Sequence, residues 1–125
     1  RWKGSVMPLI RGSAQGDFAG LQLQWEAPAS MCVVLASGGY PGSYEKGKVI
    51  SGLDAAAALP HVTVFHAGTA LDGERVVTSG GRVLSGTAIG QSIDEAAERA
   101  YEAVDAIDFE GKQLRRDIGW RARTR

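Results

Sequence analysis

An arginine directly behind a pair of glycines is the feature of this sequence best suited to bind an anion. It lies in the stretch TSGGRVLSGTAIG (residues 78–90), where Arg82 follows Gly80 and Gly81. The planar guanidinium of arginine suits bidentate contact with a phosphate, and nearby glycine N–H groups can add donors. The alternative is an exposed arginine in a turn, and composition alone favours that alternative.

A second basic stretch, RRDIGWRA (residues 115–122), offers another candidate. It places Arg115, Arg116 and Arg121 around an apolar Ile118-Gly119-Trp120 centre, and Asp117 can hold one arginine in place and leave another free for an anion. The alternative is an ordered C-terminal brace, whose surface ion pairs contribute little to stability. The last eleven residues carry five arginines and one aspartate, and such a charge run is more often solvated than a binding site.

The other residue types that commonly carry chemistry form no recognisable motif. His61 and His66 are the only histidines and Cys32 is the only cysteine, at spacings that match no metal-binding pattern. No Walker sequence and no spaced G-x-G-x-x-G is present. Because His66 alternates with apolar residues, we expect it to be a hydrogen-bonded core histidine. Cys32 lies in an apolar run and is expected to be a small core residue.

The glycine-rich loop over residues 37–47 is predicted to be a conformational element that binds no nucleotide. Tyr40-Pro41-Gly42-Ser43 fits a type II turn, in which glycine accepts the positive φ of the third position. Tyr40 or Tyr44 can then fold back over the apolar face. A phosphate-binding loop would lead into a helix N-terminus, whereas this loop leads into KVISGL (residues 48–53), which is predicted to be a strand.

Length and composition favour one α+β domain without affinity for nucleic acid or membrane. The chain has 125 residues, of which 44% are apolar, and its 14 basic and 14 acidic side chains cancel. The apolar runs are too short to span a bilayer, so we expect a cytoplasmic protein. A first residue other than methionine and a basic C-terminus fit a domain of a longer polypeptide.

The order of expected elements indicates a small antiparallel sheet. Apolar or alternating runs predict strands over residues 31–36, 48–53 and 62–68. Residues 75–79 and 82–90 are predicted to form a hairpin around Gly80-Gly81, and Gly86 suggests a bulge or a close backbone approach. Little βαβ alternation is present, which favours an antiparallel sheet with one long helix packed on it.

That long helix is expected to begin at Ser92. Ser92 and Glu95 have the spacing of a capping box. Apolar residues then recur at helical spacing until Ile107, and Gly111 is expected just beyond the helix end. A single helical turn is also predicted after Asp54, which could cap it, before Pro60.

Three stretches together resemble a known family. They are CVVLASGGYPGSYEKGKVISGL, VFHAGTALDGERVVTSGGRVLSGTAIGQSIDEAAERAYEAVDAIDFEG and RRDIGWRA, which cover roughly residues 31–122 in order and at matching spacing. They closely resemble the C-terminal domain of phosphoribosylamine–glycine ligase, also called glycinamide ribonucleotide synthetase. By this resemblance, residues 31–125 form the C-terminal cap domain. Residues 1–30 correspond to the end of the preceding catalytic region, which they match poorly.

The resemblance implies a role in de novo purine biosynthesis. Members of the family are ATP-grasp ligases that join 5-phosphoribosylamine to glycine with ATP and Mg²⁺, through a glycyl phosphate. The metal-binding RFGDPE stretch of the family is missing here. The resemblance therefore implies a cap that closes over the substrate site of the ATP-grasp core in the same polypeptide. Alone, the chain is expected to be inactive and to bind neither ATP nor Mg²⁺.

The resemblance also bears on the arginines. In related enzymes a hairpin of the C-terminal domain supplies basic groups to the phosphate of the ribosyl substrate. By motif, this implies that Arg82, Gly81 and Arg116 bind the phosphate of 5-phosphoribosylamine, with no catalytic residue in the chain. The alternative is a detached, non-catalytic module that binds an anion or a partner.

Overall fold

The described part of the chain combines a three-stranded sheet, a two-stranded ribbon and four helices. The computed structural model describes residues 1–26 and 29–123. In chain order the elements are α1 (Met7–Gln15), β1 (Ala29–Ala36), α2 (Leu53–Ala57), β2 (Val62–His66), β3 (Thr69–Asp72), β4 (Arg75–Thr78), β5 (Arg82–Gly90), α3 (Ile93–Ala106) and α4 (Trp120–Arg123).

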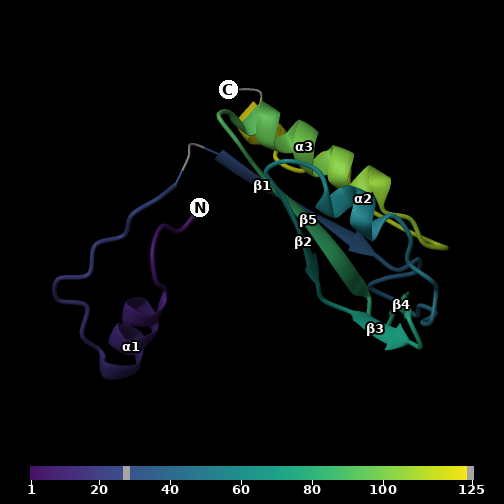
Figure 1. Cartoon of the computed structure of the whole chain (residues 1–125), viewed down its shortest axis with the longest axis horizontal. Coiled ribbons are helices and arrows are strands. Elements are labelled where there is room, and N and C mark those ends of the chain that lie inside the picture. The colour runs from purple at the N-terminus through teal and green to yellow at the C-terminus, as the bar shows by residue number, and fades with distance from the viewer. Residues whose placement is uncertain (27–28, 124–125) are drawn as a thin grey trace.

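The main sheet is antiparallel and has the strand order β1-β5-β2. Helix α3 lies along one face of this sheet, with α2 beside it, whereas β3 and β4 form a separate ribbon beyond the end of β2 (Figure 1). The predicted α+β class, with one long helix packed on a small antiparallel sheet, is confirmed. We call the face under α3 the inner face and the opposite one the outer face.

Small residues allow α3 to lie close to the central strand. A Cβ on Gly86 of β5 would lie 2.7 Å from Cγ1 of Val104 on the helix, so the predicted close approach at Gly86 is confirmed. Strand β1 contributes Met31, Val33 and Leu35 to the same core. The buried residues of α3 are Ala96, Ala97, Ala100, Ala103 and Val104, which form the core face of the expected apolar stripe.

The predicted start of the long helix is confirmed. The Ser92 hydroxyl accepts a hydrogen bond from the Glu95 N–H at 3.1 Å. The Glu95 carboxylate accepts in return from the N–H of Gln91, one residue before the cap. Two N–H groups at the start of the helix are thereby satisfied, as in a capping box.

The predicted hairpin around Gly80-Gly81 is wrong. Strand β4 pairs with β3, whereas β5 pairs with β1 and β2, so the two glycines join the ribbon to the main sheet. The actual hairpin turns at Gly73-Glu74, between Asp72 and Arg75, with Gly73 at a φ of +62°. A glycine at the first position of a two-residue loop is a known hairpin signal.

The predicted strand over residues 48–53 is also wrong. This segment makes only isolated bridges, Val49 to Val77 and Ser51 to Asp108. Gly52 has a φ of +80°, and a Cβ there would lie 1.8 Å from the Ala106 carbonyl oxygen, so the chain turns where a strand would continue. Gly52 is the N-cap residue of α2, and no side chain caps this helix, which corrects the role expected for Asp54.

Two residues expected in the core lie outside it. Cys32 and His66 are both exposed, although His66 is hydrogen-bonded through Nδ1 to the Thr69 hydroxyl at 3.0 Å. Residues of β1 alternate between buried and exposed, because α3 covers only the inner face. The continuous run of apolar residues was compatible with a strand buried on both faces. The prediction of a buried Cys32 was wrong because only one face of β1 is buried.

The predicted type II turn at residues 40–43 is wrong too. Gly42 is absent from the glycines of positive φ, which in this loop are Gly39 at +93° and Gly47 at +80°. The Tyr40–Pro41 peptide bond is cis. The loop turns at Gly39, where a Cβ would lie 2.2 Å from the Ser43 carbonyl oxygen.

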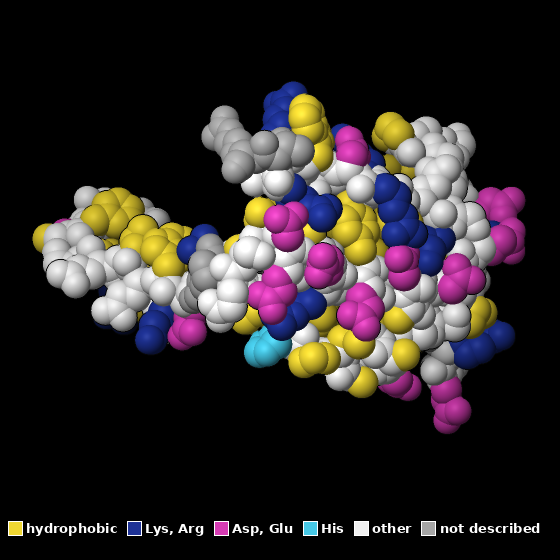
Figure 2. Space-filling view, turned by 90° about the horizontal axis from the view of Figure 1, so that it is seen from above, with side chains coloured by type: hydrophobic (Ala, Val, Ile, Leu, Met, Phe, Trp, Pro, Cys, Tyr) yellow, Lys and Arg dark blue, Asp and Glu magenta, His cyan; other side chains and the backbone are white. Residues whose placement is uncertain are grey.

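The N-terminal segment stands apart from the sheet (Figures 1 and 2). It is closed by a bridge between Trp2 and Trp25, whose rings meet edge to face at 5.8 Å. Hydrophobic side chains gather on its surface in Figure 2; the large exposed ones are Val6, Met7, Ile10, Phe18, Leu23 and Trp25. By contrast, acidic and basic side chains are interspersed on the face that carries α3 (Figure 2).

Candidate functional site

A bulge at the start of β5 sets the direction of Arg82. Leu35 pairs with Leu84 but its neighbour Ala36 pairs with Arg82, so Val83 is an extra residue on β5. The bulge allows Val83 and Leu84 to be buried in succession, and it leaves Arg82 exposed beside Ala36. Bulges commonly re-aim a side chain in this way.

The turn before Arg82 is held by hydrogen bonds from two sides. The buried Ser37 donates its hydroxyl to the Gly80 carbonyl at 2.9 Å and its N–H to the Gly81 carbonyl at 2.8 Å. The Gly68 carbonyl accepts from the N–H groups of Ser79 and Gly80. Gly81 is buried, and its N–H donates to no other backbone group among residues 1–26 and 29–123.

Arg82 lies in an open groove on the outer face of the sheet. The groove has two parts, of about 780 and 520 Å³, and both are lined by Val34, Tyr40 and Arg82. The larger part is also lined by Ala36, Lys112, Gln113, Leu114 and Arg115. The smaller part is also lined by Ala67, Gly68, Gly81, Leu84 and Ser85. The floor is thus largely apolar and the charged side chains are all basic.

Of the basic side chains of the groove, two already have partners. Arg115 makes a bidentate contact with Asp117, at 2.9 and 2.7 Å, which lowers the pKa of that carboxyl and raises the pKa of the guanidinium. The Lys112 ammonium donates to the carbonyls of Val104 and Ile107 at the end of α3. Arg82 has no hydrogen-bond or ion-pair partner among the described residues, which leaves its guanidinium free for a ligand.

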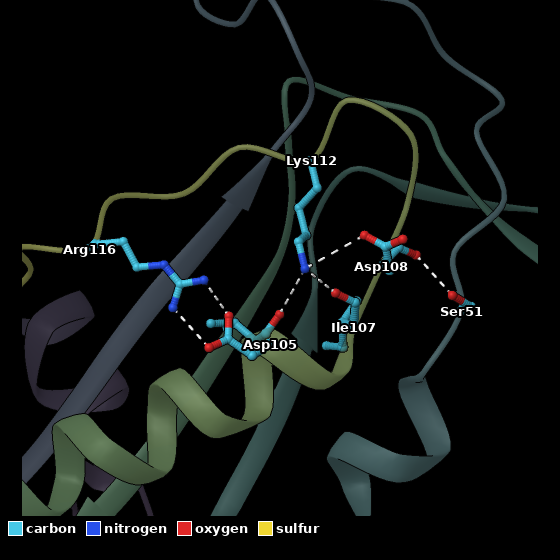
Figure 3. Close-up of polar contacts among 7 residues, drawn as sticks. Ser51, Asp105, Ile107, Asp108, Lys112 and Arg116 are labelled. Carbon is cyan, nitrogen blue, oxygen red and sulfur yellow. Dashed lines mark hydrogen bonds and ion pairs between the residues drawn. The ribbon is translucent and has the colours of Figure 1, made fainter.

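Arg116 lies on the other side, against α3 (Figure 3). Its guanidinium donates to both Asp105 oxygens, at 2.8 and 2.6 Å, and lies 5.7 Å from the centre of the Tyr101 ring. The hydrogen bond lowers the pKa of Asp105 and raises that of Arg116. Of the three predicted site residues, the structure therefore brings Arg82 and Gly81 together and leaves Arg116 elsewhere.

Two residues of the groove were missed as site residues. Arg115 was one of the arginines that Asp117 could hold or leave free, but only Arg116 was assigned to the substrate phosphate. Either Tyr40 or Tyr44 was expected to fold over an apolar face, and the ring of Tyr40 lies against Gly81. Nothing in the local sequence links Tyr40 to Arg82, because the two meet only through the fold.

The groove does not fit a magnesium nucleotide. Magnesium prefers carboxylate oxygens and water, and no acidic residue lines either part of the groove. Across the described part of the chain, no group of three or more His, Cys, Asp or Glu side chains could hold a metal.

The described residues also include no helix that is long and apolar enough to cross a membrane.

Comparison with known proteins matches the sequence of this chain to one family. The family model described as "Phosphoribosylglycinamide synthetase, C domain" matches residues 30–121. The chain is 48% identical over 124 residues to the chloroplastic phosphoribosylamine–glycine ligase of Arabidopsis thaliana. It is 47% identical over 122 residues to the phosphoribosylamine–glycine ligase of Pseudomonas syringae.

A solved structure shows the same fold. The crystal structure of phosphoribosylamine–glycine ligase from Thermotoga maritima matches 88% of this chain with a TM-score of 0.66 and 35% sequence identity. The chain covers only 27% of that structure. Both curated relatives match 98% of the chain, which spans 23% of the plant protein's length and 28% of the bacterial one's.

Proposed function

Because the chain belongs to the phosphoribosylglycinamide synthetase C-domain family, we propose that it acts as the C-terminal cap of a phosphoribosylamine–glycine ligase. Such a ligase joins 5-phosphoribosylamine and glycine with ATP. In this role the chain closes over the substrate site of the ATP-grasp core and contributes no catalytic residue. Its share of the relatives' length, 23–28%, supports a partial role.

Arg82 is the residue that we assign to the phosphate of 5-phosphoribosylamine. The observation that carries this assignment is its guanidinium, which has no partner within residues 1–26 and 29–123 and lies in a groove whose charged residues are all basic. The Gly81 N–H supplies a second donor beside it. Both Arg115 and Arg116 are paired with an aspartate, but only Arg115 lines the groove, so Arg115 is the better placed second arginine.

ATP and Mg²⁺ belong to the core in this proposal. The groove lacks the carboxylates that a magnesium ion requires, so this chain's part is to bind and orient a phosphate. A cytoplasmic location stays a prediction, because one relative is named as a chloroplast enzyme.

Kinetics of an Arg82→Ala variant test the proposal, in a full-length ligase that carries this domain. A charge-assisted contact to phosphate contributes about 1.5–3 kcal/mol, so kcat/KM for phosphoribosylamine should fall roughly tenfold to a hundredfold. The KM for ATP should stay near its starting value. Arg82→Lys should recover only part of the loss, because the fork geometry is missing.

Arg75→Ala is the matched control. Arg75 is an exposed arginine of the β3–β4 ribbon, paired with Asp72 and outside the groove. Its removal should leave both substrate constants unchanged. If a folded Arg82→Ala enzyme uses phosphoribosylamine as well as the Arg75→Ala enzyme does, Arg82 is only a turn residue and the assignment is wrong.

A further inference from the structure

The ring of Tyr40 lies directly on the turn from which Arg82 starts. A Cβ added to Gly81 would lie 2.1 Å from Cδ2 and 2.6 Å from Cε2 of Tyr40. Only a glycine therefore allows the ring to occupy this position. Tyr40 is 38% exposed, and its ring lines both parts of the groove next to Arg82.

The loop that carries Tyr40 is itself held to the same turn. Ser37, at the end of β1, binds the carbonyls of Gly80 and Gly81, and the Tyr40 N–H donates to the Ser37 carbonyl at 3.1 Å. Gly39, which has a positive φ, turns the backbone so that Tyr40 comes back toward Ser37. Residues 37–40 therefore wrap the glycine pair, through the hydrogen bonds of Ser37 and the ring of Tyr40.

The apolar ring of Tyr40 makes this contact. Tyr44 adds an edge-to-face contact with the ring, at 6.3 Å between centroids. The Tyr40 hydroxyl has no hydrogen-bond partner within the described residues. A phenyl ring at this position would keep every contact that touches the turn.

From these contacts we infer that Tyr40 is a positioning residue for Arg82. The ring fixes the Gly80-Gly81 turn, and thereby the point and direction from which the guanidinium enters the groove. Holding a charged donor in place before the ligand arrives lowers the entropy that binding costs, and small misplacements are expensive. This inference rests on the proposed function, in which Arg82 binds the substrate phosphate.

A double-mutant cycle between Tyr40 and Arg82 tests the inference in the full-length ligase. We expect Tyr40→Ala to lower kcat/KM for phosphoribosylamine by about tenfold or more, and to leave the KM for ATP unchanged. Tyr40→Phe should behave like the unmodified enzyme. In an Arg82→Ala background, Tyr40→Ala should have almost no further effect, because the residue acts through Arg82.

Two outcomes would overturn the inference. Equal losses in Tyr40→Phe and Tyr40→Ala would mean that the hydroxyl contacts substrate itself. Losses that simply multiply in the double variant would mean that Tyr40 acts independently of Arg82. If Arg82→Ala alone changes nothing, it is the proposed function that fails, so the two failures can be told apart.

A second measurement covers the case in which Tyr40→Ala weakens folding. In the 125-residue chain, the NMR signal of the Arg82 Nε–H reports how mobile the guanidinium is. Tyr40→Leu, which retains an apolar side chain, should increase that mobility, whereas Tyr40→Phe should not. The amide signals of α3 should be the same in all three proteins, which shows that the fold is intact. An Arg82 signal of equal mobility in all three proteins would exclude a positioning role.

Discussion

Glycines of the 37–47 loop differ in what an added methyl group would meet. Gly39 has a φ of +93°, and a Cβ there would lie 2.2 Å from a backbone oxygen, that of Ser43. We expect Gly39→Ala to lower the free energy of unfolding by more than about 1 kcal/mol, because both the backbone conformation and the contact oppose it. Urea unfolding followed by circular dichroism measures this change.

The same loop provides two matched controls. Gly47 has a φ of +80° but nothing within 4 Å of an added Cβ, so Gly47→Ala tests backbone strain without a clash. Gly42 lacks the positive φ, and its added Cβ would lie 3.1 Å from the Gly39 oxygen. The loss in free energy of unfolding should be largest for Gly39→Ala, smaller for Gly47→Ala and smallest for Gly42→Ala. A larger loss for Gly42→Ala than for Gly39→Ala would instead support the type II turn.

Single residues show where prediction from the sequence ends. The Pro41-Gly42 pair fits a known turn, but the position of the turning glycine depends on the approach of Ser43 to Gly39. Cys32 was expected in the core because β1 reads as one apolar run. It is exposed because no helix of the described chain covers the outer face, and the sequence of β1 alone does not indicate which face is covered.

Among the elements, the segment after α3 makes an ion pair whose contribution to stability should respond to acid. Arg116 donates two hydrogen bonds to Asp105 and holds the pKa of that carboxyl below 3.8, the ordinary value of an aspartate. A folded-state pKa below the unfolded value stabilises the fold above pH 3.8, and this contribution is lost as the pH falls through the folded value. We expect a small contribution, since both side chains are largely exposed.

Denaturant unfolding at several pH values checks this expectation. Asp105→Asn should remove part of the stability loss below pH 3.8, and Arg116→Gln should remove about the same part. Added salt should shrink both effects, because exposed pairs are screened. If Asp105→Asn loses as much stability at low pH as the unmodified chain, this ion pair does not contribute to the acid sensitivity of the fold.

Elements with local signals were predictable, and those set by long-range pairing were not. The start of α3 follows from Ser92 and Glu95, three residues apart, which the structure confirms. The partner of β5 cannot be deduced from the Gly80-Gly81 pair, because β1 and β2 reach it from distant parts of the chain. A turn that joins two sheets has the same local sequence as a hairpin.

At the scale of the whole molecule, the candidate site is a product of the fold. Arg82 was identified by its own sequence context, whereas Tyr40 and Arg115 join it from segments about forty residues before and thirty after it. Among the residues that the structure describes, no helix covers the outer face of the sheet, which carries Val34 at 41% exposure. In the proposed ligase, this face and its groove are directed at the bound substrate.

Catalysis is the property that we do not expect from this chain by itself. It spans 23–28% of the length of its relatives, and phosphoryl transfer depends on positioned cations and metal ions that stabilise developing charge. Arg82 is one cation in a groove without carboxylates. We therefore expect the purified 125-residue chain to release no ADP from ATP when glycine and phosphoribosylamine are added. A coupled assay with a full-length ligase as positive control measures this, and ADP release by the chain that requires both substrates would disprove its role as a cap.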